Sequence, residues 1–111
     1  MFIITGSLGL VGSSASEYFL KKRIPVIGID NNLRSYFFGK NGSNIWKKKY
    51  LKKNKLYSHY NIDIRNKKKI FEIFKKNSNK IKAIIHTAAQ PSHDWAAKEP
   101  FIDYNVNTTG T

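Results

Sequence analysis

The 111-residue sequence contains no cysteine, only three prolines and only three arginines. The lack of cysteine excludes a disulfide framework and a thiolate metal site. No stretch reaches the ~18 consecutive apolar residues of a membrane-spanning helix. The apolar N-terminus also lacks the basic region that opens a signal peptide. We therefore expect a cytoplasmic protein that has no membrane partner.

Acidic residues are scarce: seven face 20 basic residues, which gives a formal net charge of +13. Such an excess can indicate nucleic-acid binding. The lysines, however, form short scattered runs, and arginine, which nucleic-acid readers favour, occurs only at Arg23, Arg34 and Arg65. We expect a solvated, lysine-rich surface and no nucleic-acid partner; a basic nucleic-acid binder remains an alternative interpretation.

What the chain does contain is apolar runs that alternate between strand and helix patterns. Hydrophobic residues make up 41% of the sequence, enough for the core of one domain. Almost purely apolar strands between amphipathic helices are typical of a parallel sheet covered on both faces. The sequence thus predicts an α/β fold, a Rossmann-type doubly wound parallel sheet of about four strands. We expect strands at 2–5, 26–30, 56–64 and 81–87, and helices after residue 10, at 45–51, 67–76 and 95–98 and from 101 onward.

Two details of this pattern concern apolar side chains. Val11, Ala15, Tyr18 and Phe19 recur at helical spacing, so we expect them on the buried face of the first helix. Residues 31–55 lose the periodicity, and a long loop of this kind is usually functional or poorly ordered. Its aromatic residues either cover the sheet, which we favour, or stack on a base; they are Tyr36, Phe37, Phe38 and Trp46.

Glycines follow the first strand at Gly6, Gly9 and Gly12, spaced G-x-x-G-x-x-G. In such a turn the first glycine allows a tight bend, the second lets a pyrophosphate approach the backbone, and the third lets the next helix pack closely. The unpaired N–H groups of that helix then face the phosphates. A kinase-type phosphate loop is excluded, because Ser13 and Ser14 replace its Lys-Ser/Thr. We predict that the whole turn binds a dinucleotide: Gly6, Ser7, Leu8, Gly9, Leu10, Val11 and Gly12.

Asp30 ends the second strand, 18 residues after Gly12 (30 − 12). This is the expected place for a carboxylate that accepts hydrogen bonds from the adenosine ribose. A carboxylate there repels a 2′-phosphate, which predicts NAD rather than NADP. The alternative is that Asp30 only starts a turn.

Together with these features, three further segments resemble the extended short-chain dehydrogenases, which include sugar epimerases and dehydratases. They are Asp63-Ile64-Arg65, residues 85–89 (Ile-His-Thr-Ala-Ala) and residues 107–111 (Asn-Thr-Thr-Gly-Thr). The resemblance implies that Asp63 and Ile64 contact adenine and that small residues after the fourth strand let NAD lie against the backbone. It adds these cofactor-binding residues to the prediction: Asn31, Asn32, Asp63, Ile64, Ala88, Ala89, Gln90 and Asn107.

Two stretches are similar more narrowly to the CDP-paratose 2-epimerases, also called CDP-tyvelose epimerases. One is residues 30–34 with 37–39, and the other is residues 88–96, Ala-Ala-Gln-Pro-Ser-His-Asp-Trp-Ala. This resemblance implies a CDP-sugar substrate whose carbon 2 is inverted by transient oxidation and re-reduction. A different sugar-nucleotide epimerase or dehydratase, or a free-standing NAD-binding module without catalysis, remains open.

The Tyr-x-x-x-Lys pair of the resembled family is expected after Thr111. Tyr18 and Lys22 have the same spacing, but they lie on the first helix, in the adenosine half, away from the nicotinamide. We therefore expect residues 1–111 to be a truncated NAD-binding domain without catalytic residues. Such a domain would be marginally stable and inclined to associate, and a homo-oligomer is a possible state.

The remaining polar candidates give weaker predictions. Ser92, His93 and Asp94 are consecutive, so their side chains diverge and a nucleophilic triad is excluded. Ser92 and His93 are hypothesised to contact the substrate, because binding residues are often on loops. His86 is interpreted as a packed, hydrogen-bonded residue. With His59 and His93 it shows no metal-ligand spacing, and we predict no metal site.

Overall fold

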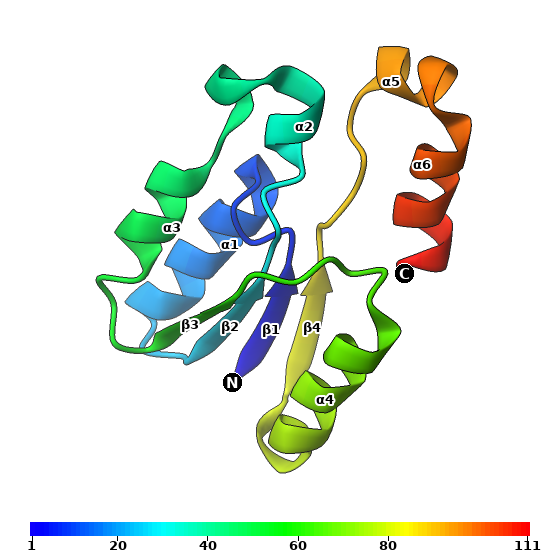
Figure 1. The fold of residues 1–111 in the computed structure, drawn as a ribbon. Coiled ribbons are helices and arrows are strands. Elements are labelled where there is room, and N and C mark those ends of the chain that lie inside the picture. The colour runs from blue at the N-terminus through cyan, green and yellow to red at the C-terminus, as the bar shows by residue number, and fades with distance from the viewer.

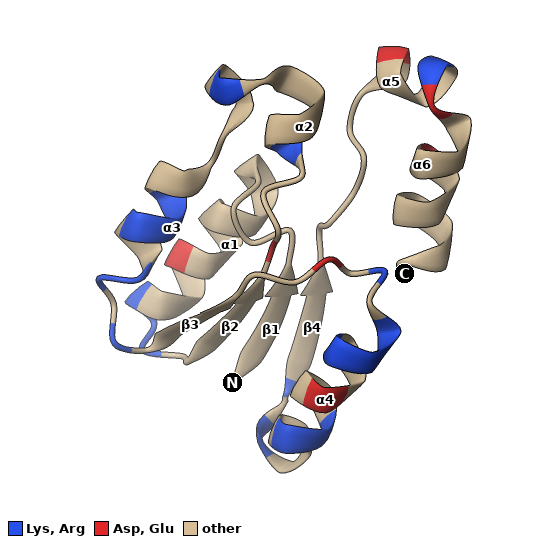
Figure 2. Cartoon of the chain, in the orientation of Figure 1, with Lys and Arg blue, Asp and Glu red and all other residues tan.

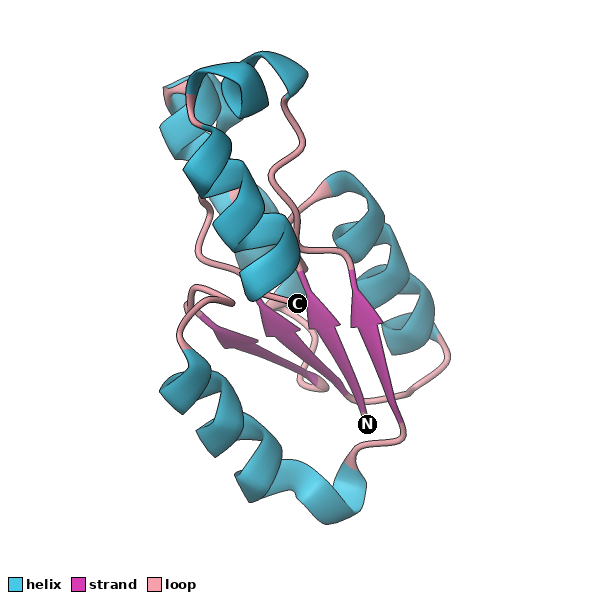
Figure 3. Ribbon diagram, turned by 90° about the vertical axis from the view of Figure 1, so that its right-hand side faces the viewer, coloured by secondary structure: helices cyan, strands magenta, loops and turns pink.

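The computed structural model describes residues 1–111 as one parallel four-stranded sheet with helices on both faces (Figures 1 and 3). Its strands are β1 (Phe2–Thr5), β2 (Val26–Ile29), β3 (Tyr57–Tyr60) and β4 (Ala83–His86). They lie in the order β3-β2-β1-β4, so the chain crosses from one side of β1 to the other before β4. The predicted Rossmann-type arrangement is confirmed.

The helices connect these strands. In chain order they are α1 (Leu10–Lys21), α2 (Arg34–Phe38), α3 (Ile45–Leu51), α4 (Lys67–Asn77), α5 (His93–Lys98) and α6 (Pro100–Tyr104), with 3₁₀ turns at Lys40–Gly42 and Ser78–Lys80 and a π-helical stretch at Asn105–Thr109. None of these helices has the length and apolar content needed to cross a lipid bilayer. Basic residues are concentrated on α3 and α4 (Figure 2).

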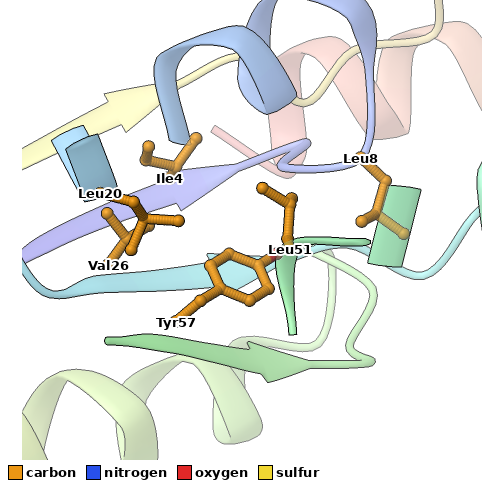
Figure 4. Packing of buried hydrophobic residues seen from close by; sticks show 6 residues of the cluster. All are labelled: Ile4, Leu8, Leu20, Val26, Leu51 and Tyr57. Carbon is orange, nitrogen blue, oxygen red and sulfur yellow. The ribbon is translucent and has the colours of Figure 1, made fainter. Parts of the chain in front are cut away.

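The core has two layers because successive strand residues point to opposite faces of the sheet. On one face, α1 and α3 pack against the strands through a cluster that Figure 4 shows: Ile4, Leu8, Leu20, Val26, Leu51 and Tyr57. On the other face, α4 packs through Ile73 against Ile3, Ile27 and Ile29. The predicted apolar face of α4 is confirmed, since Ile70 and Phe74 also pack on this second cluster.

The prediction for the first helix was partly wrong. Val11 and Tyr18 are exposed, while the buried residues of α1 are Gly12, Ser13, Ser16 and Leu20. Small side chains let this helix lie close to the sheet, and the Ser16 hydroxyl donates to the Gly12 carbonyl at 2.8 Å, so no polar atom is left unpaired. A periodicity count of large apolar residues therefore misses a helix packed through small ones.

The excursion between β2 and β3 also differs from the prediction. Helix α3 has the expected bounds, but α2 was not foreseen, and β3 and β4 are shorter than the predicted strands. Most of the aromatic residues do not cover the sheet: Tyr36, Phe38 and Trp46 are exposed, and only Phe37 is buried. Their local sequence is not periodic, so contacts between distant segments determined which ring was buried.

Candidate functional site

A cavity of about 390 Å³ lies at the carboxyl ends of the strands. Its size is within the range of ligand pockets, and the switch in strand order beside β1 is the usual ligand position in such sheets. The segments after β2 and β3 line one side of the cavity, and the loop after β4 lines the other side. The predicted binding residues that line it are Gly6, Gly9, Leu10, Val11, Gly12, Asp30, Asn31, Asp63, Ile64, Ala88 and Ala89.

Two glycines of the turn are required by packing within the chain, independently of any ligand. Gly6 has φ +65°, and a Cβ at this position would lie 2.6 Å from the Ala88 nitrogen. A Cβ on Gly12 would lie 2.1 Å from the Gly6 carbonyl oxygen. Both contacts are shorter than atoms tolerate, so these glycines allow the turn to pack between α1 and the end of β4.

Gly9 differs, because a Cβ there would meet only the Gly6 carbonyl oxygen, at 3.2 Å. Gly9 is also the N-cap of α1, where no side chain caps the helix and no acidic residue occupies the first turn. The backbone N–H groups of Leu10, Val11 and Gly12 therefore have no acceptor within the chain, and all three residues line the cavity. Unpaired amides at a helix N-terminus form an anion site.

A lysine from α3 reaches the same helix end. The Lys47 ammonium donates to the Ser13 hydroxyl at 3.1 Å and to the Gly9 carbonyl at 3.5 Å. A cation near a helix N-terminus opposes the helix dipole. Its placement increases the positive potential around the unpaired amides.

Asp30 has two functions in the structure. Its carboxylate accepts from the Leu8 N–H at 2.9 Å and from the Asn32 N–H at 2.7 Å, one at each oxygen. These bonds hold the glycine turn and a left-handed Asn32, whose φ is +57°. A carboxylate has about four acceptor positions, so Asp30 retains capacity for a ligand in the cavity. The turn-residue interpretation and the ligand interpretation are thus compatible.

A buried polar network lies beneath the glycine turn. The Ser7 hydroxyl is fully buried and lies 3.0 Å from the Tyr57 hydroxyl, which in turn lies 3.2 Å from His59 Nδ1. Gly28 leaves room for this pair, because a Cβ there would lie 2.1 Å from the Tyr57 oxygen. Burial raises the pKa of Tyr57 to about 12. Burial and then Lys48 lower the pKa of His59, against an opposing effect of Asp30.

Asp63 lies beside the cavity with its carboxylate extensively bonded. It accepts from the Arg65 backbone N–H and Nε, both at 2.9 Å, from Arg65 Nη2 at 2.6 Å and from Asn31 Nδ2 at 3.1 Å. The Arg65 side chain lowers the pKa of this carboxyl group, against the opposing effect of burial. An adenine amino group would therefore have to replace one of these donors.

The loop after β4 uses its polar groups internally. The Gln90 side chain is buried; its Nε2 donates to the Ser92 carbonyl at 2.9 Å and to Asp103 at 3.3 Å, and its Oε1 accepts from the Ser92 N–H. The Asn107 side chain accepts from the Gln90 N–H at 2.8 Å. Contrary to expectation, neither side chain lines the cavity. The same is true of Ser7, Leu8 and Asn32.

The proposed substrate contacts are also outside the cavity. Ser92 is the N-cap of α5 and accepts from the Trp95 N–H at 3.3 Å. His93 and Asp94 are almost fully exposed and 3.9 Å apart, so no triad forms. His86 is hydrogen-bonded at both ring nitrogens, to Thr5 at 2.7 Å and Thr111 at 3.1 Å, although it is exposed rather than packed.

The sequence did not predict that α2 and the residue before it line the cavity, through Leu33, Arg34 and Phe37. Trp95 of α5 donates its indole N–H to the Phe37 carbonyl at 2.9 Å, and the two rings lie 5.5 Å apart, which ties α2 to α5. The short aromatic run 36–38 could have indicated this packing, but Trp95, which contacts Phe37, is 58 positions away in the sequence. The missed lining residues are Ile29, Leu33, Arg34, Phe37, Asn44, Ile62, Thr87, Pro91 and Val106.

A protein family and a curated protein match this chain over nearly its whole length. A family model described as GDP-mannose 4,6 dehydratase matches residues 3–111. A UDP-glucuronate 4-epimerase from Thermodesulfobacterium geofontis is 32% identical over 110 residues, which are 99% of this chain and 32% of that protein. The chain therefore spans about a third of the length of the curated relative that it matches.

Solved structures match the fold. A Thermotoga maritima UDP-glucose 4-epimerase with UDP-glucose gives a TM-score of 0.79 at 23% identity, covering 98% of this chain and 30% of that one. A Bacillus cereus UDP-glucuronic acid 4-epimerase mutant, in complex with NAD and a fluorinated UDP-sugar, gives 0.73 at 23% identity, covering 94% and 31%. At this identity the likeness supports the fold alone.

Proposed function

The chain belongs to the GDP-mannose 4,6 dehydratase family of extended short-chain dehydrogenases, and from this premise we propose that it is the NAD-binding part of a nucleotide-sugar epimerase. One observation carries the proposal: the unpaired amides of Leu10, Val11 and Gly12 face the cavity beside Gly9, where no side chain fills the space. A dinucleotide pyrophosphate supplies the negative charge and the acceptors that this site lacks.

The other cavity residues fit the remaining parts of NAD. Asp30 would accept from the adenosine ribose with the capacity that Leu8 and Asn32 leave free. Ile64, from the segment after β3, presents apolar surface for adenine, and the adenine amino group would bond to Asp63 by replacing one of its present donors. Ala88 and Ala89 line the cavity after β4 with small side chains.

NAD, when bound, would supply the reversible oxidation and reduction of a sugar carbon that inversion requires. The residues of this chain hold the cofactor and leave proton transfer to groups elsewhere in the protein that carries this sequence. For the sugar, we propose a CDP-linked hexose inverted at carbon 2. Supporting this are residues 30–34 with 37–39 and residues 88–96, whose sequences are similar to the CDP-paratose 2-epimerases.

A second candidate is a UDP-sugar 4-epimerase. It is favoured by the 32% identical UDP-glucuronate 4-epimerase relative, which matches this chain over nearly its whole length. Both candidates use the same cofactor and differ in the nucleotide and the carbon that is inverted.

Cofactor binding is tested with the purified protein that carries this chain, using calorimetric titration of NAD. We expect binding by the unaltered protein and a loss of at least about 100-fold for Gly9→Val, because the branched side chain fills the space at the unpaired amides. The matched control is Ser14→Ala, an exposed position one turn later in α1. Equal NAD affinity of Gly9→Val and Ser14→Ala would refute the proposed site.

The substrate is tested on the same protein with bound NAD, by incubating CDP-paratose and UDP-glucuronate separately and identifying the product by NMR. Inversion at carbon 2 of the CDP-sugar supports the first candidate. Inversion at carbon 4 of the UDP-sugar alone would replace it with the second.

A further inference from the structure

Arg34 is an arginine at the cavity without a protein partner. It is the first residue of α2 and lines the cavity, yet its guanidinium forms no salt bridge and donates no hydrogen bond within the chain. It lies over the Phe38 ring, with 4.5 Å between the guanidinium carbon and the ring centroid. By contrast, Arg65 is fully engaged with Asp63.

An arginine at this position is informative because most basic residues of the chain are lysines. Only three of its 20 basic residues are arginine, so a solvated positive charge alone does not account for this position. The guanidinium differs from an ammonium group in being planar and weakly hydrated, and it stacks on aromatic faces. Phe38 lies against the Arg34 guanidinium. Arg34 lines the cavity and Phe38 does not, so a ligand ring would approach the guanidinium from the cavity side.

The surroundings of Arg34 in the cavity suit an aromatic ring with polar edges. Ile62 and Ile64, from the segment after β3, line the same cavity with apolar surface, while Asn31 and Asp63 bring polar groups to it. A purine placed there meets apolar side chains, and its amino group reaches Asp63 if it replaces one of the present donors of that carboxylate. Asp30, at the same cavity, disfavours an added phosphate close to the guanidinium.

We propose that Arg34 binds the adenine of the dinucleotide by stacking its guanidinium on the ring, with Phe38 supporting the guanidinium from behind. This inference rests on the proposed function. It assigns the recognition of adenine to a residue of α2, an element that lies outside the glycine turn and outside the Asp63-Ile64-Arg65 segment. The alternative chemistry for an arginine in this place is capture of a ribose 2′-phosphate, which would make NADP the better ligand.

The experiment measures the dissociation constants of ADP-ribose, NAD and NADP by calorimetry, with the protein that carries this chain and three variants. Arg34→Met keeps the length of the side chain but removes the plane and the charge, and Arg34→Lys keeps the charge but removes the plane. Lys40→Met is the matched control, since it removes a positive charge from an exposed residue of the same excursion that does not line the cavity. Thermal melts of the free variants check that each one folds.

We expect both Arg34 variants to bind ADP-ribose about 2- to 5-fold more weakly, as cation–π stacking by an exposed guanidinium predicts. Lys40→Met should bind like the unaltered protein. Wild-type affinity for ADP-ribose in Arg34→Lys would overturn the stacking proposal, because charge alone would then suffice. Tighter wild-type binding of NADP than of NAD, lost in Arg34→Met, would overturn it in favour of the 2′-phosphate role. If the unaltered protein binds neither NAD nor ADP-ribose, the proposed function fails instead.

Discussion

The two sides of the cavity use their polar groups differently. On the side of the glycine turn, the amides of Leu10, Val11 and Gly12 remain without acceptors. On the side of the loop after β4, the polar side chain of Gln90 is bonded to Ser92 and Asp103, and Asn107 accepts from the Gln90 backbone N–H. Polar groups that stay unpaired at a cavity indicate a ligand, while those paired internally indicate a scaffold. We therefore expect substitutions on the first side to change affinity and those on the second to change stability.

Gly12→Ala should have the largest effect. The added Cβ would lie 2.1 Å from the Gly6 carbonyl oxygen, which is backbone and cannot rotate away. We predict a loss of about 3 kcal/mol or more in the free energy of unfolding, through overpacking at a rigid contact, measured by urea denaturation. Gly9→Ala is the matched control, with its nearest contact at 3.2 Å. Similar losses for the two variants would show that the distinction between these glycines is wrong.

Asp30→Ala should lower both the stability of the protein and its affinity for NAD. It leaves the Leu8 and Asn32 amides without their acceptor, which costs about 2 kcal/mol of stability. It also removes the proposed ribose partner, so NAD should bind at least about 10-fold more weakly. Asp94→Ala, at an exposed carboxylate, serves as control for the lost charge. Unchanged NAD affinity in Asp30→Ala would show that Asp30 only stabilises the turn and does not bind the cofactor.

Gln90→Ala tests the other side of the cavity. It removes the buried amide that bonds to Ser92 and Asp103, and we predict a destabilisation of about 1 to 2 kcal/mol. Because Gln90 does not line the cavity, NAD affinity should stay close to that of the unaltered protein. Asn79→Ala, at an exposed 3₁₀ residue, is the control. A large loss of affinity with little loss of stability would reverse the assignment of this loop.

The smallest expected effect concerns pH. Burial, followed by Lys48, lowers the pKa of His59 in the folded state, so the protonated form favours the unfolded chain. The stability that neutral His59 provides is present above its unfolded pKa of about 6.5. It is lost as the pH falls from there through the lower folded pKa.

The melting temperature should therefore decrease between pH 7.5 and pH 5.5 by a few degrees at most, because His59 is only half-buried. His59→Asn keeps an acceptor for the Tyr57 hydroxyl and should show a smaller decrease over the same interval. An equal decrease in both proteins would assign the effect to other groups.

Much of the fold could be predicted because the deciding patterns are local. The apolar runs of β1 and β2, the bounds of α3 and the apolar face of α4 all follow from residue type and spacing. The glycine turn and Asp30 were predictable for the same reason, since their spacing along the chain corresponds to one strand-turn-helix-strand unit. Predictions failed for α2, for the exposed aromatic rings and for Val11 and Tyr18 of α1, where long-range packing decided the outcome, whereas Ala15 and Phe19 pack on the core.

By itself, the sequence determined the alternation of the four strands with the longer helices, the glycine turn and the acid that follows β2, because each depends on neighbouring residues. Only the tertiary structure decided which polar groups remain available to a ligand. Asp63 is bonded by Arg65 and Asn31, Gln90 is enclosed by Ser92 and Asp103, and Arg34 is left at the cavity with Phe38 behind it. The physical reason is that hydrogen-bond partners are assigned by proximity in space, which a one-dimensional pattern does not contain.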